Sequence, residues 1–163
     1  MWYDMDKKIV GRYTMEIERK YLIKELPDLS QYRYVDIEQG YLCTNPVIRI
    51  RKKGKKYIIT YKGEGLMERE EIEAEITKEA YEHLKEKIDG KLICKRRYLI
   101  PFNPFTIELD VFSGHMKGLI MAEVEFADAG YAKAFIPPAW FGEEVTEDTR
   151  YHNSNMIFGN PLK

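Results

Sequence analysis

Apolar and charged residues alternate along most of this chain, with the period of two that is typical of β-strands. The alternation runs through eight segments, at about residues 16–24, 32–43, 46–53, 56–62, 68–76, 92–100, 105–113 and 118–126. In VIRIR, for example, Arg49 and Arg51 share a face with Val47, while Ile48 and Ile50 take the other. The pattern predicts eight strands, nearly all with one charged face and one apolar face.

Three other segments have helical features. Residues 77–88 place apolar side chains at helical spacing after Thr77, a favoured N-cap residue. Residues 127–135 form a shorter candidate, which Pro137 and Pro138 end. Residues 150–158 form a third, which Thr149 can cap. These helices are candidates to cover the apolar faces of the strands.

The charges on the strand faces come in like-signed pairs, two residues apart. The pairs are Glu16 with Glu18, Arg49 with Arg51, Lys95 with Arg97, Glu108 with Asp110, and Glu123 with Glu125. Like charges placed as neighbours destabilise a sheet unless opposite charges or bound ions lie against them. A closed sheet with a polar interior meets this requirement. The predicted fold is therefore α+β, with a closed antiparallel eight-stranded β-barrel that forms a charged tunnel and is covered outside by helices.

The segment MEIERKYLI places Glu16, Glu18 and Lys20 on one strand face. Two carboxylates spaced roughly 6.5–7 Å apart along a strand favour a cation between them. A hard divalent ion takes oxygen ligands and commonly keeps substrate phosphate as a further ligand, for which Lys20 would be well placed. An exposed strand with a solvated charged face gives the same pattern, so this motif alone leaves both interpretations open.

Taken together, these residues resemble the CYTH superfamily of triphosphate tunnel metalloenzymes, in particular its short bacterial members. The resemblance runs from Met15 to about Phe158. Its segments are Glu16-x-Glu18-x-Lys20, Arg49-x-Arg51, Thr60-x-Lys62, Arg69-x-Glu71-x-Glu73, Lys95-x-Arg97-Tyr98, Glu108 to Phe112, Glu123 to Phe126, and a closing stretch at 136–153. The resemblance implies an enzyme that hydrolyses inorganic triphosphate to diphosphate and phosphate inside the tunnel, with Mg²⁺ or Mn²⁺ as cofactor.

The charges and the resemblance together assign roles in this site. The expected metal ligands are Glu16, Glu18, Glu123 and Glu125, then Asp110, with Glu71 and Glu73 behind them or at a second metal. The expected substrate-binding cations are Lys20, Arg49, Arg51, Lys62, Arg69, Arg97 and Arg150. The expected catalytic residues are Lys95, Glu16 and Glu18. Lys95 is a candidate base, because neighbouring cations favour the loss of its proton near neutral pH. A further phosphate clamp is an equally consistent role for Lys95.

Two other functions compete with this interpretation. The same fold can act on an organic triphosphate, such as thiamine triphosphate or a nucleotide, or cyclise ATP as class IV adenylyl cyclases do. That version needs an aromatic shelf beside the tunnel mouth, for which Trp140, Phe141 and Tyr41 are candidates. A polyphosphate-binding module without catalysis is the third possibility, and the full set of acidic pairs argues against it.

The composition adds limits. The chain has 163 residues, with 26 Lys and Arg against 27 Asp and Glu, so it lacks the basic excess of a nucleic-acid-binding protein. Cys43 and Cys94 are too few for a disulfide framework or a zinc site, and no apolar run is long enough to cross a membrane. We therefore expect a cytoplasmic enzyme with a small-molecule substrate and no nucleic-acid or membrane partner, and a homodimer is left open.

Residues 15–163 are expected to form a single domain of this type. Residues 1–14 are interpreted as an N-terminal extension that packs loosely and is dispensable for catalysis. The basic run from Lys52 to Lys56 is interpreted as a solvated hairpin turn.

Overall fold

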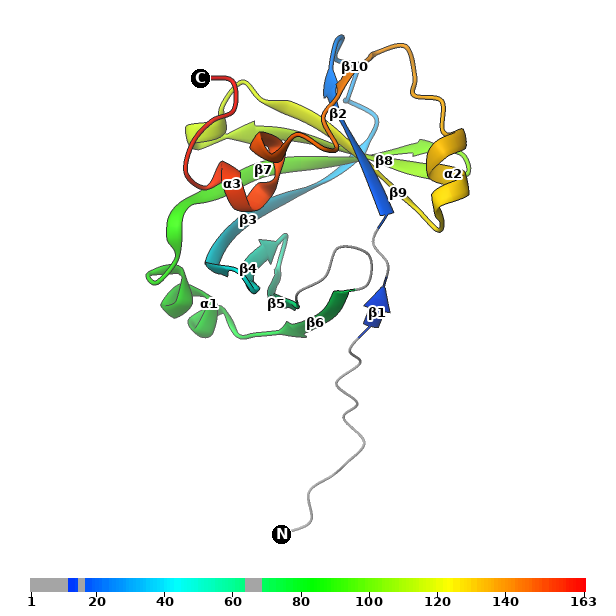
Figure 1. The fold of residues 1–163 in the computed structure, drawn as a ribbon. Coiled ribbons are helices and arrows are strands. Elements are labelled where there is room, and N and C mark those ends of the chain that lie inside the picture. Colours follow the sequence, from blue (N-terminus) through cyan, green and yellow to red (C-terminus); the bar gives the residue numbers. More distant parts are fainter. Residues whose placement is uncertain (1–11, 15–16, 64–68) are drawn as a thin grey trace.

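The computed structural model describes residues 12–14, 17–63 and 69–163, and its side-chain description covers residues 17–63 and 71–163. The chain forms one antiparallel sheet with short helices (Figure 1). Its strands are β1 (Arg12–Thr14), β2 (Ile17–Ile23), β3 (Arg33–Thr44), β4 (Val47–Lys53), β5 (Lys56–Lys62), β6 (Arg69–Glu75), β7 (Asp89–Phe102), β8 (Phe105–Ser113), β9 (Ile120–Phe126) and β10 (Phe141–Glu144). The helices are α1 (Lys78–Lys85), α2 (Ala129–Ala134) and α3 (Asn153–Met156), with 3₁₀ turns η1 (Gly114–Met116) and η2 (Thr149–Tyr151).

The sheet is open, so the predicted closed eight-stranded barrel is wrong. Its strand order is β1-β6-β5-β4-β3-β7-β8-β9-β2-β10. The outer side of β6 pairs with β1, where Arg12 is in register with Glu71. The outer side of β2 pairs with β10, where Phe141 is in register with Ile23. Within the described residues no pairing joins the two ends of the sheet, because the edges that would close a barrel already have partner strands.

The open sheet bends into two layers. Figure 1 shows β4, β5 and β6 below β2, β7, β8 and β9, with β3 running from one layer to the other. β3 pairs with β7 over residues 33–41 and with β4 over residues 37–44, and the register shifts near Tyr41 in both ladders. Such irregularities bend a strand and increase its twist. The bend turns the charged faces of the two layers toward each other, as the barrel prediction required.

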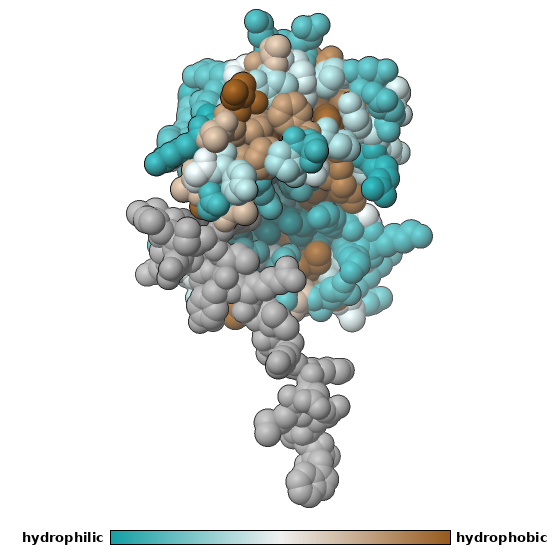
Figure 2. Space-filling model, turned by 90° about the vertical axis from the view of Figure 1, so that its right-hand side faces the viewer, coloured by the Kyte–Doolittle hydropathy of each residue, from teal (hydrophilic) through white to brown (hydrophobic). Residues whose placement is uncertain are grey.

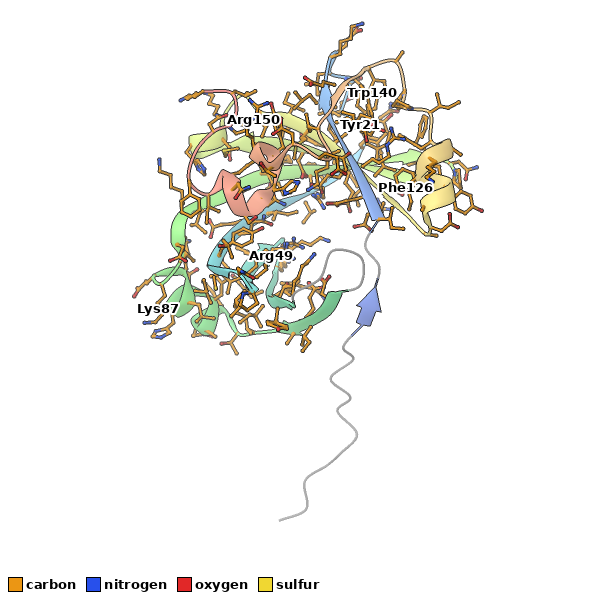
Figure 3. All side chains as sticks on the ribbon, in the orientation of Figure 1. Tyr21, Arg49, Lys87, Phe126, Trp140 and Arg150 are labelled. Carbon is orange, nitrogen blue, oxygen red and sulfur yellow. The ribbon has the colours of Figure 1, made fainter. Side chains whose placement is uncertain are left out.

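One apolar cluster covers the outer face of the upper layer. Tyr21, Leu109 and Val124 are buried there, on the strand faces opposite the charged residues. Asp128 caps α2 by accepting a hydrogen bond from Tyr131 N at 2.9 Å, and the helix packs Ala132 against this cluster. Figure 3 shows this aromatic-rich end of the molecule, where Tyr21, Phe126 and Trp140 are labelled. α2 therefore covers an apolar face, as predicted.

A second apolar cluster fills one end of the space between the layers. On β8, β9 and β7 the charged faces continue into Phe112, Met121 and Ile93, which are buried. The C-terminal segment packs on them through Tyr151, Met156 and Ile157. The charged interior therefore ends against side chains that η2 and α3 bring from the far end of the sequence.

The eight predicted strands are confirmed as β2 to β9. α1 is confirmed too, because the Thr77 side chain caps it by accepting a hydrogen bond from Ala80 N at 3.1 Å. The third predicted helix is divided into η2 and α3, with His152 between them. The sequence pattern predicted neither β10 nor β1, and β1 lies within the segment interpreted as a loose extension.

None of the helices in the described residues has the length and apolar character needed to cross a lipid bilayer.

Candidate active site

A polar cavity of about 210 Å³ lies among the facing charges of the two layers. Figure 2 shows a hydrophilic hollow between an upper and a lower part of the molecule, below a patch of hydrophobic residues. Six carboxylates, five cations and one amide line the cavity: Glu18, Glu71, Glu73, Glu108, Glu123, Glu125, Arg49, Arg51, Lys53, Lys62, Arg97 and Asn153. In Figure 3, Arg49 reaches from the lower layer into the space between the layers.

Arg97 is the centre of a buried ion network in the upper layer. Its Nη2 donates to Asp110 Oδ2 at 2.7 Å and to Glu123 Oε2 at 2.8 Å, and its Nε donates to Asp110 Oδ1 at 2.7 Å. Its Nη1 also pairs with Glu108. Burial alone would lower the pKa of Arg97, but the surrounding carboxylates raise it well above its usual value. Arg97 is therefore a permanent cation that holds three acidic strand positions together.

Lys95 lies behind this network. Its Nζ contacts Asp110 Oδ2 at 2.5 Å, and its side chain is only 1% exposed. Burial, and to a smaller extent Arg97, lowers the pKa of Lys95, although Asp110 opposes the shift. Lys95 and Asp110 are not among the described residues that line the cavity. Asp110 links Lys95 to Arg97, which does line the cavity.

Lys20 joins the carboxylates of β2 and β9. Its Nζ lies 3.0 Å from Glu18 Oε1 and 3.6 Å from Glu123 Oε1. Burial alone would lower the pKa of Lys20, but Glu123 and Glu18 raise it. Burial would likewise raise the pKa of Glu123, but Lys95, Arg97 and Lys20 lower it strongly. Glu123 is therefore an ionised carboxylate at neutral pH.

The lower layer contributes cations with few partners. Arg49 donates from Nη2 to Thr60 Oγ1 at 3.4 Å, and its buried Nε has no hydrogen-bond partner among the residues that the structure describes. Arg51 donates from Nε to Gln39 Oε1 at 3.3 Å. Burial, with Arg49 and Arg97 nearby, lowers the pKa of Arg51 to about 10, so Arg51 remains charged at neutral pH. Both guanidinium groups are available to an anion in the cavity.

The outer part of the lower layer mixes both signs. Lys62 lies with its Nζ 3.5 Å from Glu71 Oε2, and Glu73 lines the cavity from the same strand as Glu71. The register places Glu71 opposite Lys62 and Glu73 opposite Thr60. This part of the lower layer therefore has acidic groups beside the cations, as the alternation predicted.

The carboxylates of the upper layer fit a hard divalent cation by their chemistry. Glu18 and Glu125 are opposite each other on β2 and β9, and Glu123 is two residues from Glu125. Glu123 Oε1 is buried and accepts no hydrogen bond from the described part of the chain. Oxygen-only donors suit Mg²⁺ and Mn²⁺. Within the described residues, no three acidic, histidine or cysteine side chains converge on one point, and Glu16 lies outside those residues.

The structure brings most of the predicted site residues together. Glu18, Glu71, Glu73, Glu123, Glu125, Arg49, Arg51, Lys62 and Arg97 line the cavity. Arg69 belongs to β6, but its side chain lies outside the description. Arg150 is placed elsewhere: its Nη2 pairs with Asp148 at 2.6 Å, its side chain is 67% exposed, and Figure 3 shows it away from Arg49.

Three cavity residues were absent from the predicted site. Lys53 continues the alternation of Arg49 and Arg51, which was a usable signal, but the basic run around it was interpreted as a solvated turn. Glu108 was recognised as a charged strand residue and given no role. Asn153 is neutral and lies in the non-repeating C-terminal segment, so no charge pattern indicated it.

A second cavity of about 440 Å³ adjoins the first, since Glu108 and Glu125 line both. Phe105 and Tyr131 form part of its wall. The three residues predicted as an aromatic shelf do not line this cavity. Tyr41 and Phe141 are buried in the two apolar clusters, and Trp140 packs against the first cluster.

Comparison with known proteins identifies the family to which the chain belongs. The profile of the CYTH domain matches residues 14–151. The chain belongs to the CYTH family. An inorganic triphosphatase of Nitrosomonas europaea is 42% identical over 151 residues, which cover 90% of this chain and 99% of that protein. An inorganic triphosphatase of Acetivibrio thermocellus is 38% identical over 152 residues, covering 91% and 96%.

The fold comparison agrees with the sequence comparison. A crystal structure of an inorganic triphosphatase superposes with a TM-score of 0.72 at 40% identity, covering 93% of this chain and 99% of that one. The predicted CYTH resemblance is thus confirmed, and the facing charged layers are those of a CYTH protein.

Proposed function

We propose that this CYTH protein hydrolyses inorganic triphosphate to diphosphate and phosphate. The observation that carries the proposal is the cavity itself: Arg49 and Arg51 face it with few protein partners, opposite the carboxylates of β2 and β9. Two relatives of nearly full-length coverage are inorganic triphosphatases. A triphosphate carries several negative charges, and guanidinium groups bind phosphate oxygens through two donors at once.

The substrate would be bound by cations from both layers. Arg49, Arg51 and Lys62 approach from the lower layer, and Arg97 approaches from the upper layer. Phosphoryl transfer depends mainly on positioning the phosphates and stabilising the charge that shifts during transfer. Cations that are already fixed on strands on both sides of the cavity can position the phosphates and stabilise this charge without rearrangement. Lys20 keeps Glu18 and Glu123 in place through its ion pairs.

Glu18, Glu123 and Glu125 would hold Mg²⁺ or Mn²⁺, together with Glu16 as predicted from the sequence. Glu71 and Glu73 remain candidates for a second ion across the cavity. Bound metal would supply Lewis acidity and lower the pKa of a coordinated water. Glu123 Oε1 supports this assignment, because it is buried and accepts no hydrogen bond from the described residues, with Lys20 Nζ at 3.6 Å. The ionised state of Glu123 also supports it, because a protonated carboxyl group would bind a cation poorly.

For Lys95 we propose a positioning role. Its ammonium contacts Asp110, and Asp110 in turn receives two hydrogen bonds from Arg97. This arrangement fixes the guanidinium of Arg97 in the orientation in which it also contacts Glu123. The alternative role as a general base stays a prediction, and its test is given below.

The cell compartment and the partners follow from the same account. Cys43 and Cys94 are both free thiols, which suits a reducing cytoplasm. The near balance of 26 basic and 27 acidic residues supports a small-molecule substrate without nucleic-acid or membrane partners. A homodimer is compatible with the proposed chemistry but is not required by it.

A substrate panel tests the proposal. The purified protein is incubated with inorganic triphosphate, ATP and diphosphate in Mg²⁺ or Mn²⁺, and released phosphate and cyclic AMP are measured. We expect catalytic efficiency to fall from triphosphate to ATP to diphosphate, no cyclic AMP, and no turnover in excess EDTA. Comparable efficiency on ATP would favour the organic-substrate alternative, and Tyr131→Ala would then lower the ATP rate alone, because Tyr131 borders only the second cavity.

A further inference from the structure

Asn153 is the neutral residue among the described side chains that line the charged cavity. It begins α3, directly after η2, and so comes from a different part of the chain than the strand cations. It is half-buried. Its side chain is the point at which the C-terminal segment reaches the site.

The backbone around Asn153 is held firmly. His152 N donates to Thr149 O at 3.1 Å, and Met156 N donates to His152 O at 3.0 Å. The imidazole Nε2 of His152 lies 3.2 Å from Thr146 O. The flanking residues Tyr151 and Met156 are buried in the second apolar cluster. The backbone position of Asn153 is therefore fixed, and its side chain lines the cavity without any rearrangement of the segment.

The side-chain oxygen of Asn153 is left without a partner by the described residues. Asn153 Oδ1 is buried and has no hydrogen-bond partner within the described residues. A buried polar group without a partner is destabilising, so natural proteins rarely keep one without a reason. By contrast, Asn155 on the same short helix donates from Nδ2 to Thr149 O at 2.8 Å and is exposed. Asn155 supports the helix, whereas Asn153 has no such structural bond.

We propose that Asn153 is a substrate-positioning residue whose amide binds a phosphate oxygen of inorganic triphosphate. This inference rests on the proposed function. An amide offers two N–H donors and one carbonyl acceptor. The donors suit a phosphate oxygen, and the acceptor suits a guanidinium N–H such as the unpaired Arg49 Nε or a water molecule in the same cavity. Asn153 thus adds a direction-specific contact without adding another charge.

The test compares three variants of the full chain: Asn153→Ala, Asn153→Asp and, as the matched control, Asn155→Ala. Binding of inorganic triphosphate in EDTA is measured by calorimetry, KM and kcat are measured with Mg²⁺, and thermal unfolding is followed without ligand. We expect Asn153→Ala to weaken binding about tenfold or more, as loss of a hydrogen bond to a charged group does. Its unfolding temperature should not fall. Asn153→Asp has nearly the same shape and should weaken binding further, because its carboxylate repels the phosphates.

Asn155→Ala should show the opposite pattern, with a lower unfolding temperature and unchanged triphosphate affinity. Wild-type affinity in both Asn153 variants would overturn the proposal. An Asn153→Ala effect on KM and kcat that matched the loss of folded protein would overturn it too. If the wild-type protein neither bound nor hydrolysed triphosphate, the proposed function would fail along with this inference. Normal wild-type activity with unaffected Asn153 variants would refute the inference alone.

Discussion

The two layers that face the cavity carry similar numbers of charged side chains, but these side chains differ in how they are paired. In the upper layer Arg97, Lys95, Asp110 and Glu123 are buried and paired with one another at 2.5–2.8 Å. In the lower layer the side-chain hydrogen bonds of Arg49 and Arg51 to other described residues are long, at 3.4 and 3.3 Å, and go to neutral side chains. The buried charges of the upper layer thus neutralise one another. The proposed function assigns Arg49 and Arg51 of the lower layer to the phosphates of the substrate.

This difference teaches where stability and binding are located. Removing one partner of a buried ion network leaves the others uncompensated, which is strongly destabilising. Removing one of two neighbouring buried cations relieves repulsion instead. Charge changes in the two layers should therefore have opposite effects on folding, although both lower activity.

The largest effect is expected for Arg97→Met. The change leaves Asp110, Glu123 and Glu108 without their shared cation. We expect the free energy of unfolding in urea to fall by about 3–5 kcal/mol, with loss of activity. Arg96→Met is the matched control, because Arg96 is on the outer face, pairs with Asp36 and is 43% exposed. It should cost about 0–1 kcal/mol. Equal costs for both variants would contradict the division between the layers.

Arg51→Met should separate activity from stability. The pKa of Arg51 is lowered to about 10 chiefly by burial and then by Arg49 and Arg97, while Glu73 opposes the shift more weakly. Loss of one positioned donor should reduce kcat/KM for triphosphate by about two to three orders of magnitude, while the folded state is retained. Lys52→Met alters the next residue, on the opposite strand face, and should keep wild-type activity. Phosphate release assays decide this, and an Arg51→Met enzyme with normal efficiency would remove Arg51 from the site.

Lys95→Arg distinguishes the two roles of Lys95. A general base must lose its proton, so a rate that depends on Lys95 rises with pH through the lysine pKa, and arginine cannot replace it. A positioning residue needs only to remain a cation beside Asp110. We expect Lys95→Arg to keep the shape of the pH–rate profile with a modest loss of rate. A profile that loses its acidic limb, with little residual activity, would establish the base role instead.

The smallest effect is expected at Lys53, at the exposed end of the cationic row. The row Arg49, Arg51, Lys53 spans about 14 Å along β4, and Lys53 is its most distant member. Lys53→Ala should change kcat/KM for triphosphate less than twofold but lower that for tetraphosphate several-fold. Lys55→Ala in the same hairpin is the control, since Lys55 does not line the cavity. Equal losses on both substrates would show that Lys53 contributes only a general field.

The sequence predicted the parts of the fold that depend on alternation. The charged faces of β2 to β9 followed directly from the period of two, and so did the position of Arg49 and Arg97 on facing surfaces. Whether the sheet closes into a barrel or stays open could not be predicted from alternation. β1 and β10 are three and four residues long and carry no alternating pattern, yet they occupy the edges that a barrel would join.

The sequence did not predict the positions of two side chains, one held by a short-range ion pair and one without charge. Arg150 lies two residues from Asp148, and this short-range ion pair keeps its side chain at the surface. Asn153 has no charge and belongs to a segment without periodicity. The difference between the ion-paired Arg97 and the cations Arg49 and Arg51, which contact neutral side chains, depends on side-chain distances. Strand parity does not contain these distances.

The most direct test of the account is the unfolding free energy of wild type and Arg51→Met, each measured with and without saturating inorganic triphosphate in EDTA. The account predicts that Arg51→Met is at least as stable as wild type when both are free, because a crowded cation is gone. It predicts the reverse order when both are bound, because a ligand stabilises the form that binds it more tightly. Lower stability of Arg51→Met in the free state, or equal stabilisation of both proteins by triphosphate, would contradict it.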